Sequence, residues 1–308
     1  MQLATIPVFP EFRPLTLADK PIVETFTAQY EPYSDFNFVS VWTNNIADDI
    51  QISNLNGNFV MKFRDYISNE PFYTFLGHSN VNETVSKLLS QAIQEKILRQ
   101  LKLIPETVIK ADPTLFKNFE VIEDIDNHDY IISIPKIKEM KGKHYLTKRR
   151  LVRIFKQNNP YWNVRKLDLS SPQTQQDILN LFSVWEQEKH KSHSDTEHEL
   201  IAIRRLLRDA HMLDLLGFGV FVTEKLCAFA ISQPVHNGHM VGLFSKSNPT
   251  YKGIGEVLHY HFSQYLHDLG YKYHNFAQDL GFPNLRRSKE LWQPIKKLKK
   301  YIVKPKNL

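Results

Sequence analysis

One short segment of the chain combines an acid, a glycine turn and several bases. Residues 277–294 read AQDLGFPNLRRSKELWQP, so Asp279 stands just before Gly281, and Arg286 and Lys289 follow in a predicted helix. A carboxylate can orient or deprotonate an attacking amine, and neighbouring cations can bind a phosphate or carboxylate group. The segment therefore predicts a group-transfer site in which Asp279 is catalytic and the two bases bind substrate.

The same residues have a structural interpretation. Asp279 could instead cap the helix LRRSKELW, or form a stabilising ion pair with Arg286. A charge at a buried strand end is costly unless it is paired or used. Both alternatives remain open at this point.

A basic connector near the middle of the chain supplies further candidates. Tyr145, Lys148 and Arg149 lie in KGKHYLTKRRLVRIFK (141–156), which has helical periodicity. We predict that these three residues bind substrate together with the bases of the last segment.

A glycine-rich turn lies between a predicted strand and a predicted helix. PTYKGIGEVLHYHF (249–262) contains Lys252, Gly253 and Gly255, and a turn of this kind exposes N–H groups that bind phosphate at a helix N-terminus. The pattern resembles the pyrophosphate loop of the GNAT acyltransferases, with Thr250 where that family usually has Gln or Arg. The resemblance implies acyl-CoA as cofactor, and an ordinary turn is the alternative.

Composition limits the class of protein. A chain of 308 residues with 42% hydrophobic residues favours two globular domains. Cys227 is the single cysteine, so no internal disulfide forms, and the 13 histidines lack the spacing of a zinc motif, so we expect no metal. No apolar run approaches the roughly 20 residues of a membrane span, and no signal peptide is visible. We expect a cytoplasmic protein without a transmembrane segment.

The positive charge is unevenly distributed. The formal net charge is +6, and the excess gathers in residues 136–156 and 286–306. Clustered bases favour anionic partners such as nucleic acid, a cofactor phosphate or a lipid headgroup.

The order of predicted elements indicates an α+β fold. In the second half, a strand at 162–169 precedes two helices, an antiparallel meander over 218–247, a helix ended by Gly270, and a strand–helix–strand tail. The first half has three short strands, DIQISNL, GNFVMKFRD and PFYTFLGH, followed by a long helix over 82–101. We predict two similar domains, 1–140 and 141–308, with the connector helix and the active cleft in the second.

A further motif lies in the first half. YSDFNF (33–38) precedes the helical segment FVSVW, for which Asp35 is the favoured N-cap. An aromatic, amide-rich substrate groove is the alternative.

Three segments, 30–45, 129–160 and 278–303, resemble a family of bacterial proteins similar to the C-terminal catalytic domain of phosphatidylglycerol lysyltransferases. The resemblance implies two tandem GNAT-like domains, a fold shared with the Fem peptidyltransferases, which take amino acids from aminoacyl-tRNA. Leu146 and Arg150 replace the family's more usual His and Asn, and Phe276-Ala277 replaces its usual N-R-E.

These observations predict an N-acyl or aminoacyl transferase. The donor is an aminoacyl-tRNA or an acyl-CoA, and the acceptor is an amine or hydroxyl of a small molecule, a peptide or a lipid headgroup. A non-catalytic GNAT-fold binding module is one alternative. A membrane-surface protein that uses its basic tail is another.

Overall fold

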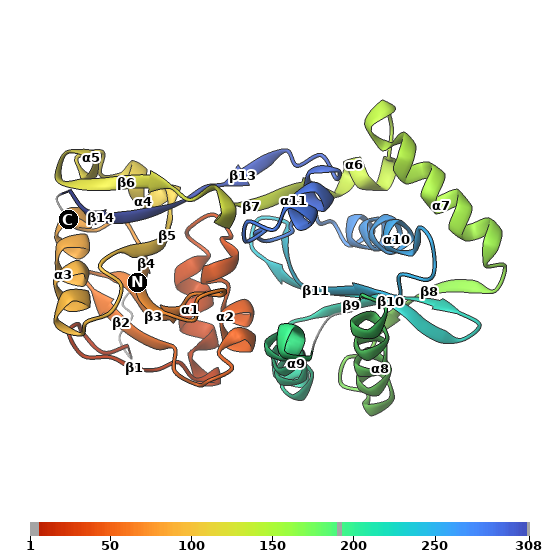
Figure 1. Ribbon diagram of the computed structural model, residues 1–308, viewed down its shortest axis with the longest axis horizontal. Coiled ribbons are helices and arrows are strands. Elements are labelled where there is room, and N and C mark those ends of the chain that lie inside the picture. Colours follow the sequence, from red (N-terminus) through yellow and green to blue (C-terminus); the bar gives the residue numbers. More distant parts are fainter. Residues whose placement is uncertain (1–5, 190–192, 307–308) are drawn as a thin grey trace. The chain divides into compact units, whose positions relative to one another are not determined.

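The chain forms two compact units that are not contiguous in sequence. The computed structural model describes residues 6–189 and 193–306 (Figure 1). Unit 1 comprises Met1–Asp129, Gln278–Arg286 and Lys297–Leu308, and unit 2 comprises Tyr130–Ala277 and Arg287–Lys296. The units therefore differ from the predicted halves 1–140 and 141–308, because the C-terminal strand adds to the first sheet.

Unit 1 is built on a seven-stranded sheet in the order β1-β2-β3-β4-β5-β14-β6. All neighbouring strands with a described register are antiparallel except β4 and β5, which are parallel. The strands are β1 (Arg13–Pro14), β2 (Gln51–Leu55), β3 (Asn58–Arg64), β4 (Pro71–Leu76), β5 (Leu101–Pro105), β6 (Phe119–Glu123) and β14 (Lys300–Pro305). The α-helices are α1 (Lys20–Thr27), α2 (Phe38–Asn44), α3 (Val81–Gln94), α4 (Glu106–Ala111) and α5 (Leu115–Asn118).

The three predicted strands of the first half are β2, β3 and β4, but the long helix is shorter than predicted. Helix α3 ends at Gln94, and Lys96 has a positive φ of 57°. The N–H of Ile97 returns to the carbonyl of Ala92, which closes the helix C-terminus. Leu101, predicted to lie in this helix, therefore starts β5 instead.

Unit 2 is built on a second seven-stranded sheet in the order β13-β7-β12-β11-β10-β9-β8. Its strands are β7 (Asp129–Ser133), β8 (Trp162–Leu167), β9 (Leu216–Val222), β10 (Lys225–Val235), β11 (His239–Ser247), β12 (Tyr273–Asn275) and β13 (Lys296–Leu298). Its α-helices are α6 (Ile134–Glu139), α7 (Leu146–Asn158), α8 (Pro172–Glu188), α9 (His193–Arg208), α10 (Ile254–Asp268) and α11 (Pro283–Glu290), the last of which starts in unit 1.

Both units contain the predicted order of an antiparallel meander, a helix and a parallel strand. In unit 2 the meander β9-β10-β11 leads to α10 and then to β12, which is parallel to β11. In unit 1 the meander β2-β3-β4 leads to α3 and then to β5, which is parallel to β4. The fold class is confirmed: two mixed sheets flanked by helices.

Helix α10 is positioned by its apolar side. Val257, Leu258, Phe262 and Leu266 are buried against the second sheet, and Gly270 in a left-handed conformation (φ 90°) follows the helix as predicted. Figure 1 shows α10 on one face of this sheet and α8 and α9 on the other. Because these four side chains are buried, only the side chains on the other sides of α10 can contribute to a site.

Candidate functional site

Asp279 lies in unit 1 and is paired with Arg286. Its side chain is 0% exposed, and both carboxylate oxygens accept hydrogen bonds from the Arg286 guanidinium, at 2.9 and 3.0 Å. The N–H of Gly281 donates to the same carboxylate, and the hydrogen bonds to Asp279 and then Asp126 raise the pKa of Arg286. This geometry favours the ion-pair alternative, and a catalytic role for Asp279 stays a prediction.

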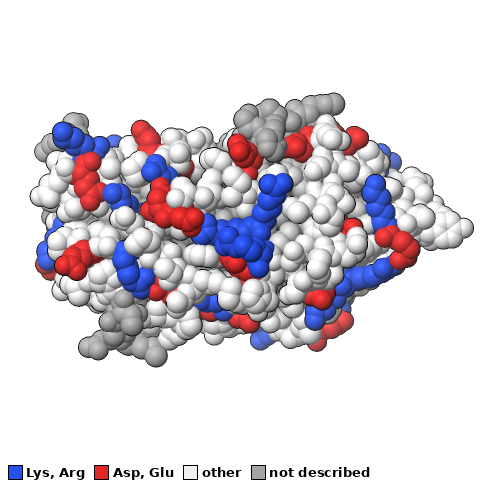
Figure 2. Space-filling model, turned by 90° about the horizontal axis from the view of Figure 1, so that it is seen from below, with Lys and Arg blue, Asp and Glu red and all other residues white. Residues whose placement is uncertain are grey.

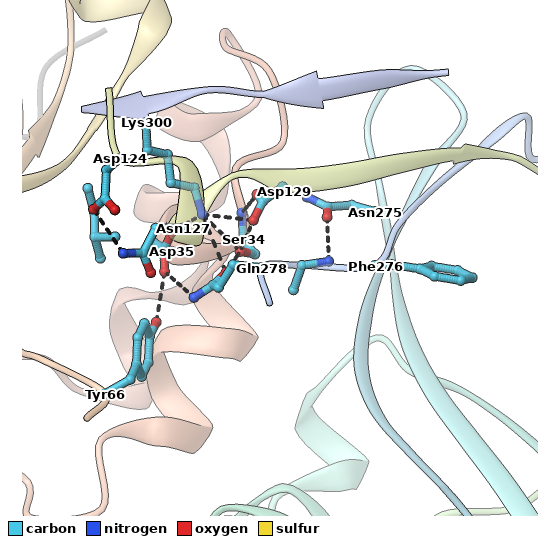
Figure 3. Close-up of polar contacts among 12 residues, drawn as sticks. Ser34, Asp35, Tyr66, Asp124, Asn127, Asp129, Asn275, Phe276, Gln278 and Lys300 are labelled. Carbon is cyan, nitrogen blue, oxygen red and sulfur yellow. Dashed lines mark hydrogen bonds and ion pairs between the residues drawn. The ribbon is translucent and has the colours of Figure 1, made fainter. Parts of the chain in front are cut away.

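A second group of charges in unit 1 is removed from water, and we call it the buried ion cluster. The Lys300 ammonium contacts the carboxylates of Asp35 and Asp129, and none of these three residues is more than 1% exposed. Figure 3 shows the cluster with its neutral partners. The cluster consists of Ser34, Asp35, Tyr66, Asp129, Gln278 and Lys300.

Each neutral residue of the cluster donates a hydrogen bond to one of the two carboxylates. The Ser34 hydroxyl donates to Asp129 at 2.7 Å, and the Tyr66 hydroxyl donates to Asp35 at 2.8 Å. Burial alone would lower the pKa of Lys300, but Asp129 and Asp35 raise it above its ordinary value. The cluster therefore keeps a charged lysine inside the unit.

The prediction that Asp35 caps the helix FVSVW is wrong. Asp35 lies in a 3₁₀ turn, Ser34–Phe36, from which its carboxylate meets Lys300. Asn37 is the N-cap of α2 instead, and its side-chain oxygen accepts from the Ser40 N–H at 2.9 Å.

The buried ion cluster joins all three segments that carry the family resemblance. Asp35 comes from 30–45, Asp129 begins 129–160, and Gln278 and Lys300 lie in 278–303. A sequence pattern does not reveal this convergence, because Lys300 looks like any charged residue at the start of the KKYIVK strand.

Three other predicted substrate-binding residues meet in unit 2 around Trp292. The Tyr145 hydroxyl donates to the Trp292 carbonyl at 3.3 Å, and the Lys148 ammonium lies 4.1 Å from the centre of the Trp292 ring. Lys289 donates to the carbonyls of Phe276 and Ala277. We call this group the Trp292 cluster: Tyr145, Lys148, Glu256, His259, Phe276, Lys289 and Trp292.

His259 is a titratable side chain of this cluster that the sequence analysis did not assign to a site. Its ring lies 5.2 Å from Phe276 and 5.1 Å from Trp292, and the side chain is half-buried. Burial, and then the charges of Lys148 and Lys289, lower the pKa of His259 to about 4. The imidazole is neutral at pH 7, which is the form that accepts a proton.

The two glycines of the predicted phosphate turn have different roles. Gly253 has a left-handed φ of 88° and packs against α7 so closely that a Cβ there would collide with the Leu151 carbonyl. Gly255 has no such constraint, since its nearest neighbour would be the Ser247 hydroxyl at 3.8 Å from a Cβ. Lys252 is exposed beside them. Of the two positions, only 253 needs a glycine. The reasons are its left-handed backbone and the close approach of α7.

The first turn of α10 also carries a carboxylate. Glu256 forms an ion pair with Lys148 of α7 at 3.1 Å. The ion pair occupies the Lys148 ammonium and α7 packs against the turn, and both contacts work against binding a pyrophosphate at this N-terminus.

Arg149, also predicted to bind substrate, has a local structural contact. Its guanidinium donates to the carbonyls of Met140 and Gly142, and so closes the turn between α6 and α7. The side chain is nevertheless exposed.

The described residues contain no group of three or more His, Cys, Asp or Glu side chains arranged to hold a metal ion. Within the same residues, no helix is long and apolar enough to cross a bilayer. Cys227 is buried, and burial raises the pKa of its thiol.

The strand order of both units defines a tandem GNAT-like protein. Residues 27–304 match the family described as "Phosphatidylglycerol lysyltransferase, C-terminal". Because this match spans most of the sequence, the chain belongs to that family.

Solved structures share the fold. A conserved protein of unknown function from Bacteroides thetaiotaomicron VPI-5482 is 24% identical, with a TM-score of 0.83 over 98% of this chain and 100% of that chain. The C-terminal domain (DUF2156) assigned to a lysylphosphatidylglycerol synthetase of Agrobacterium fabrum is 12% identical, with a TM-score of 0.61 over 94% and 92%. Among curated proteins, the comparison found no match.

Proposed function

We propose that this protein is an aminoacyltransferase whose donor is an aminoacyl-tRNA. Membership of a family described by lysyl transfer, together with the tandem fold, supports acyl or aminoacyl transfer in general. Phosphatidylglycerol, which the family description names, is the first acceptor to test.

The packing of α7 on the glycine turn is the observation that favours aminoacyl-tRNA over acyl-CoA as the donor. Acyl-CoA binding at α10 would need free N–H groups and room for a pyrophosphate at this helix N-terminus. Leu151 is packed against Gly253, and Glu256 in the first turn holds the Lys148 ammonium in an ion pair. These contacts favour the aminoacyl-tRNA branch over the acyl-CoA branch.

The proposed reaction is an acyl substitution. A hydroxyl or amine of the acceptor attacks the ester carbonyl carbon of the aminoacyl-tRNA and forms the new ester or amide bond. The bond between that carbon and the ribose oxygen breaks, and the proton of the nucleophile ends on the ribose hydroxyl. We propose that His259 relays this proton, because its ring lies in the Trp292 cluster and is neutral at pH 7, the form that can accept a proton.

The test is transfer of radiolabel from aminoacyl-tRNA, charged with lysine or with a mixture of amino acids, into phosphatidylglycerol vesicles. The wild-type protein is expected to move label into the lipid phase, and His259→Gln is expected to slow transfer by about 100-fold. Gln264→Ala on the same helix is the control. Label that stays on tRNA with lipid, amine and peptide acceptors alike would refute the proposal.

A further inference from the structure

Helix α7 has an exposed side that carries positive charge and no carboxylate. Arg149, Arg150 and Arg153 are exposed on it, and Lys143 and His144 are exposed just before its first turn. The sequence contains no Asp or Glu from residue 140 to residue 161.

Packing of the opposite side of α7 fixes which way the exposed arginines of the helix point. Lys148 and Phe155 are buried, and Val152 packs against the apolar core beneath α10. Arg153 lies three residues after Arg150 and four after Arg149, so it is a neighbour of both on the helix surface, within about one turn. We call this surface the arginine face: Lys143, His144, Arg149, Arg150 and Arg153.

Two of these arginines have no acidic partner within residues 6–189 and 193–306. In that part of the chain, no ion pair forms at Arg150 or Arg153. Several other cations of unit 2 do have acidic partners, such as Arg165 with Glu224 and Lys246 with Glu199. Figure 2 shows basic and acidic side chains interspersed over much of the face that it draws, together with one larger group of basic side chains.

We propose that the arginine face docks the phosphate backbone of the RNA donor, an inference that rests on the proposed function. Guanidinium groups bind phosphate oxygens in a bidentate way, and a row of unpaired cations loses no internal ion pair when the phosphates arrive. Tyr161, 75% exposed three residues beyond α7, adds a ring on which a base can stack.

An anionic membrane is a less suitable partner for this surface. A helix that lies in a bilayer interface needs an apolar side turned toward the lipid. The apolar side of α7 is packed inside unit 2, and among its exposed residues only Leu146, 62% exposed, is a large hydrophobic.

The experiment measures binding of fluorescently labelled, deacylated tRNA by the full chain between about 50 and 200 mM salt. Arg150→Gln/Arg153→Gln is expected to bind roughly tenfold more weakly at the low-salt end, and to reduce the slope of log K against log salt by about two. The control is Arg165→Gln/Arg204→Gln, which removes two exposed cations elsewhere in unit 2 and is expected to bind as the wild type does. Equal thermal unfolding of all variants establishes that they are folded.

The outcomes separate this inference from the proposed function. If the wild type binds tRNA and Arg150→Gln/Arg153→Gln binds equally well, the arginine face is refuted while transfer from aminoacyl-tRNA stands. If the wild type binds no tRNA, both fail. If the double variant instead loses binding to phosphatidylglycerol vesicles and keeps tRNA binding, the surface is a membrane contact and the inference is overturned. Arg153→Glu, a charge reversal, should weaken tRNA binding further.

Discussion

Two carboxylates and one lysine of unit 1 are held away from water in the buried ion cluster. Such a group is stable only when every charge has partners, and here Ser34, Tyr66 and Gln278 supply hydrogen bonds in addition to the ion pairs. The ion pairs and hydrogen bonds of Asp35 and Asp129 therefore contribute to the stability of unit 1.

Lys300→Met should destabilise the protein strongly. The change leaves Asp35 and Asp129 buried without their cation, so the free energy of unfolding should fall by about 3–5 kcal/mol. The raised pKa of Lys300 means that its contribution is complete below about pH 10 and is lost only as the pH rises through the folded value. Urea denaturation at pH 7 measures the loss.

Lys299→Met is the matched control, because Lys299 is partly exposed and its ion pair is at the surface. It should lower the free energy of unfolding far less than Lys300→Met does. Equal effects of the two substitutions would contradict the importance of the buried ion cluster.

The lowered pKa of His259 predicts a pH effect on stability. Its pKa is about 4 in the folded protein and about 6.5 in an unfolded chain, so the unfolded state binds more protons between these values. Stability should therefore fall as the pH drops from about 6.5 to about 4, with at most about 3 kcal/mol from this residue. Unfolding measured across that range should be less pH-dependent in His259→Gln than in the wild type, and parallel curves would show that His259 titrates normally.

At the scale of elements, substitutions in the glycine turn before α10 test whether its glycines serve helix packing or cofactor binding. Gly253→Ala should destabilise by about 1–3 kcal/mol, because its φ is positive and a Cβ would meet the Leu151 carbonyl. Gly255→Ala, in ordinary space at the start of the helix, should be neutral or stabilising by up to about 1 kcal/mol. Thermal denaturation compares them, and equal costs at both positions would contradict the packing of α7 as the reason for Gly253.

The elements with strong local signals could be predicted from the sequence. The Asn56-Gly57 turn between β2 and β3 and the C-terminal Gly270 of α10 both lie in left-handed conformations, as their residue types indicate. The prediction for Leu101 is wrong because apolar residues continue the helical spacing past the end of α3, whereas pairing with Tyr73 of β4 and Val303 of β14 makes it a strand residue. Local patterns do not encode such long-range pairing.

Local sequence patterns predict the candidate site only in part. Tyr145, Lys148 and Lys289 were expected to act together, and the structure brings them to Trp292. Asp279 and Arg286 belong to unit 1, although they precede Lys289 on the same segment, because the chain passes from unit 1 to unit 2 within α11.

At the scale of the whole molecule, the C-terminal strand completes the first sheet. β14 pairs with β5 on one side and with β6 on the other. A chain that ends at Lys296 lacks this strand and Lys300, so the amides of β5 and β6 should lose protection in hydrogen exchange while those of β10 in unit 2 keep it. A chain that ends at Lys306 is the control, and protected β5 amides in the shorter chain would refute a structural role for β14.

The donor is the central claim, and calorimetric titration with acetyl-CoA and with tRNA at physiological salt tests it most directly. The account predicts saturable binding of tRNA that weakens as salt rises, and no saturable heat with acetyl-CoA. Saturable acetyl-CoA binding that survives salt, with no binding of tRNA, would contradict it.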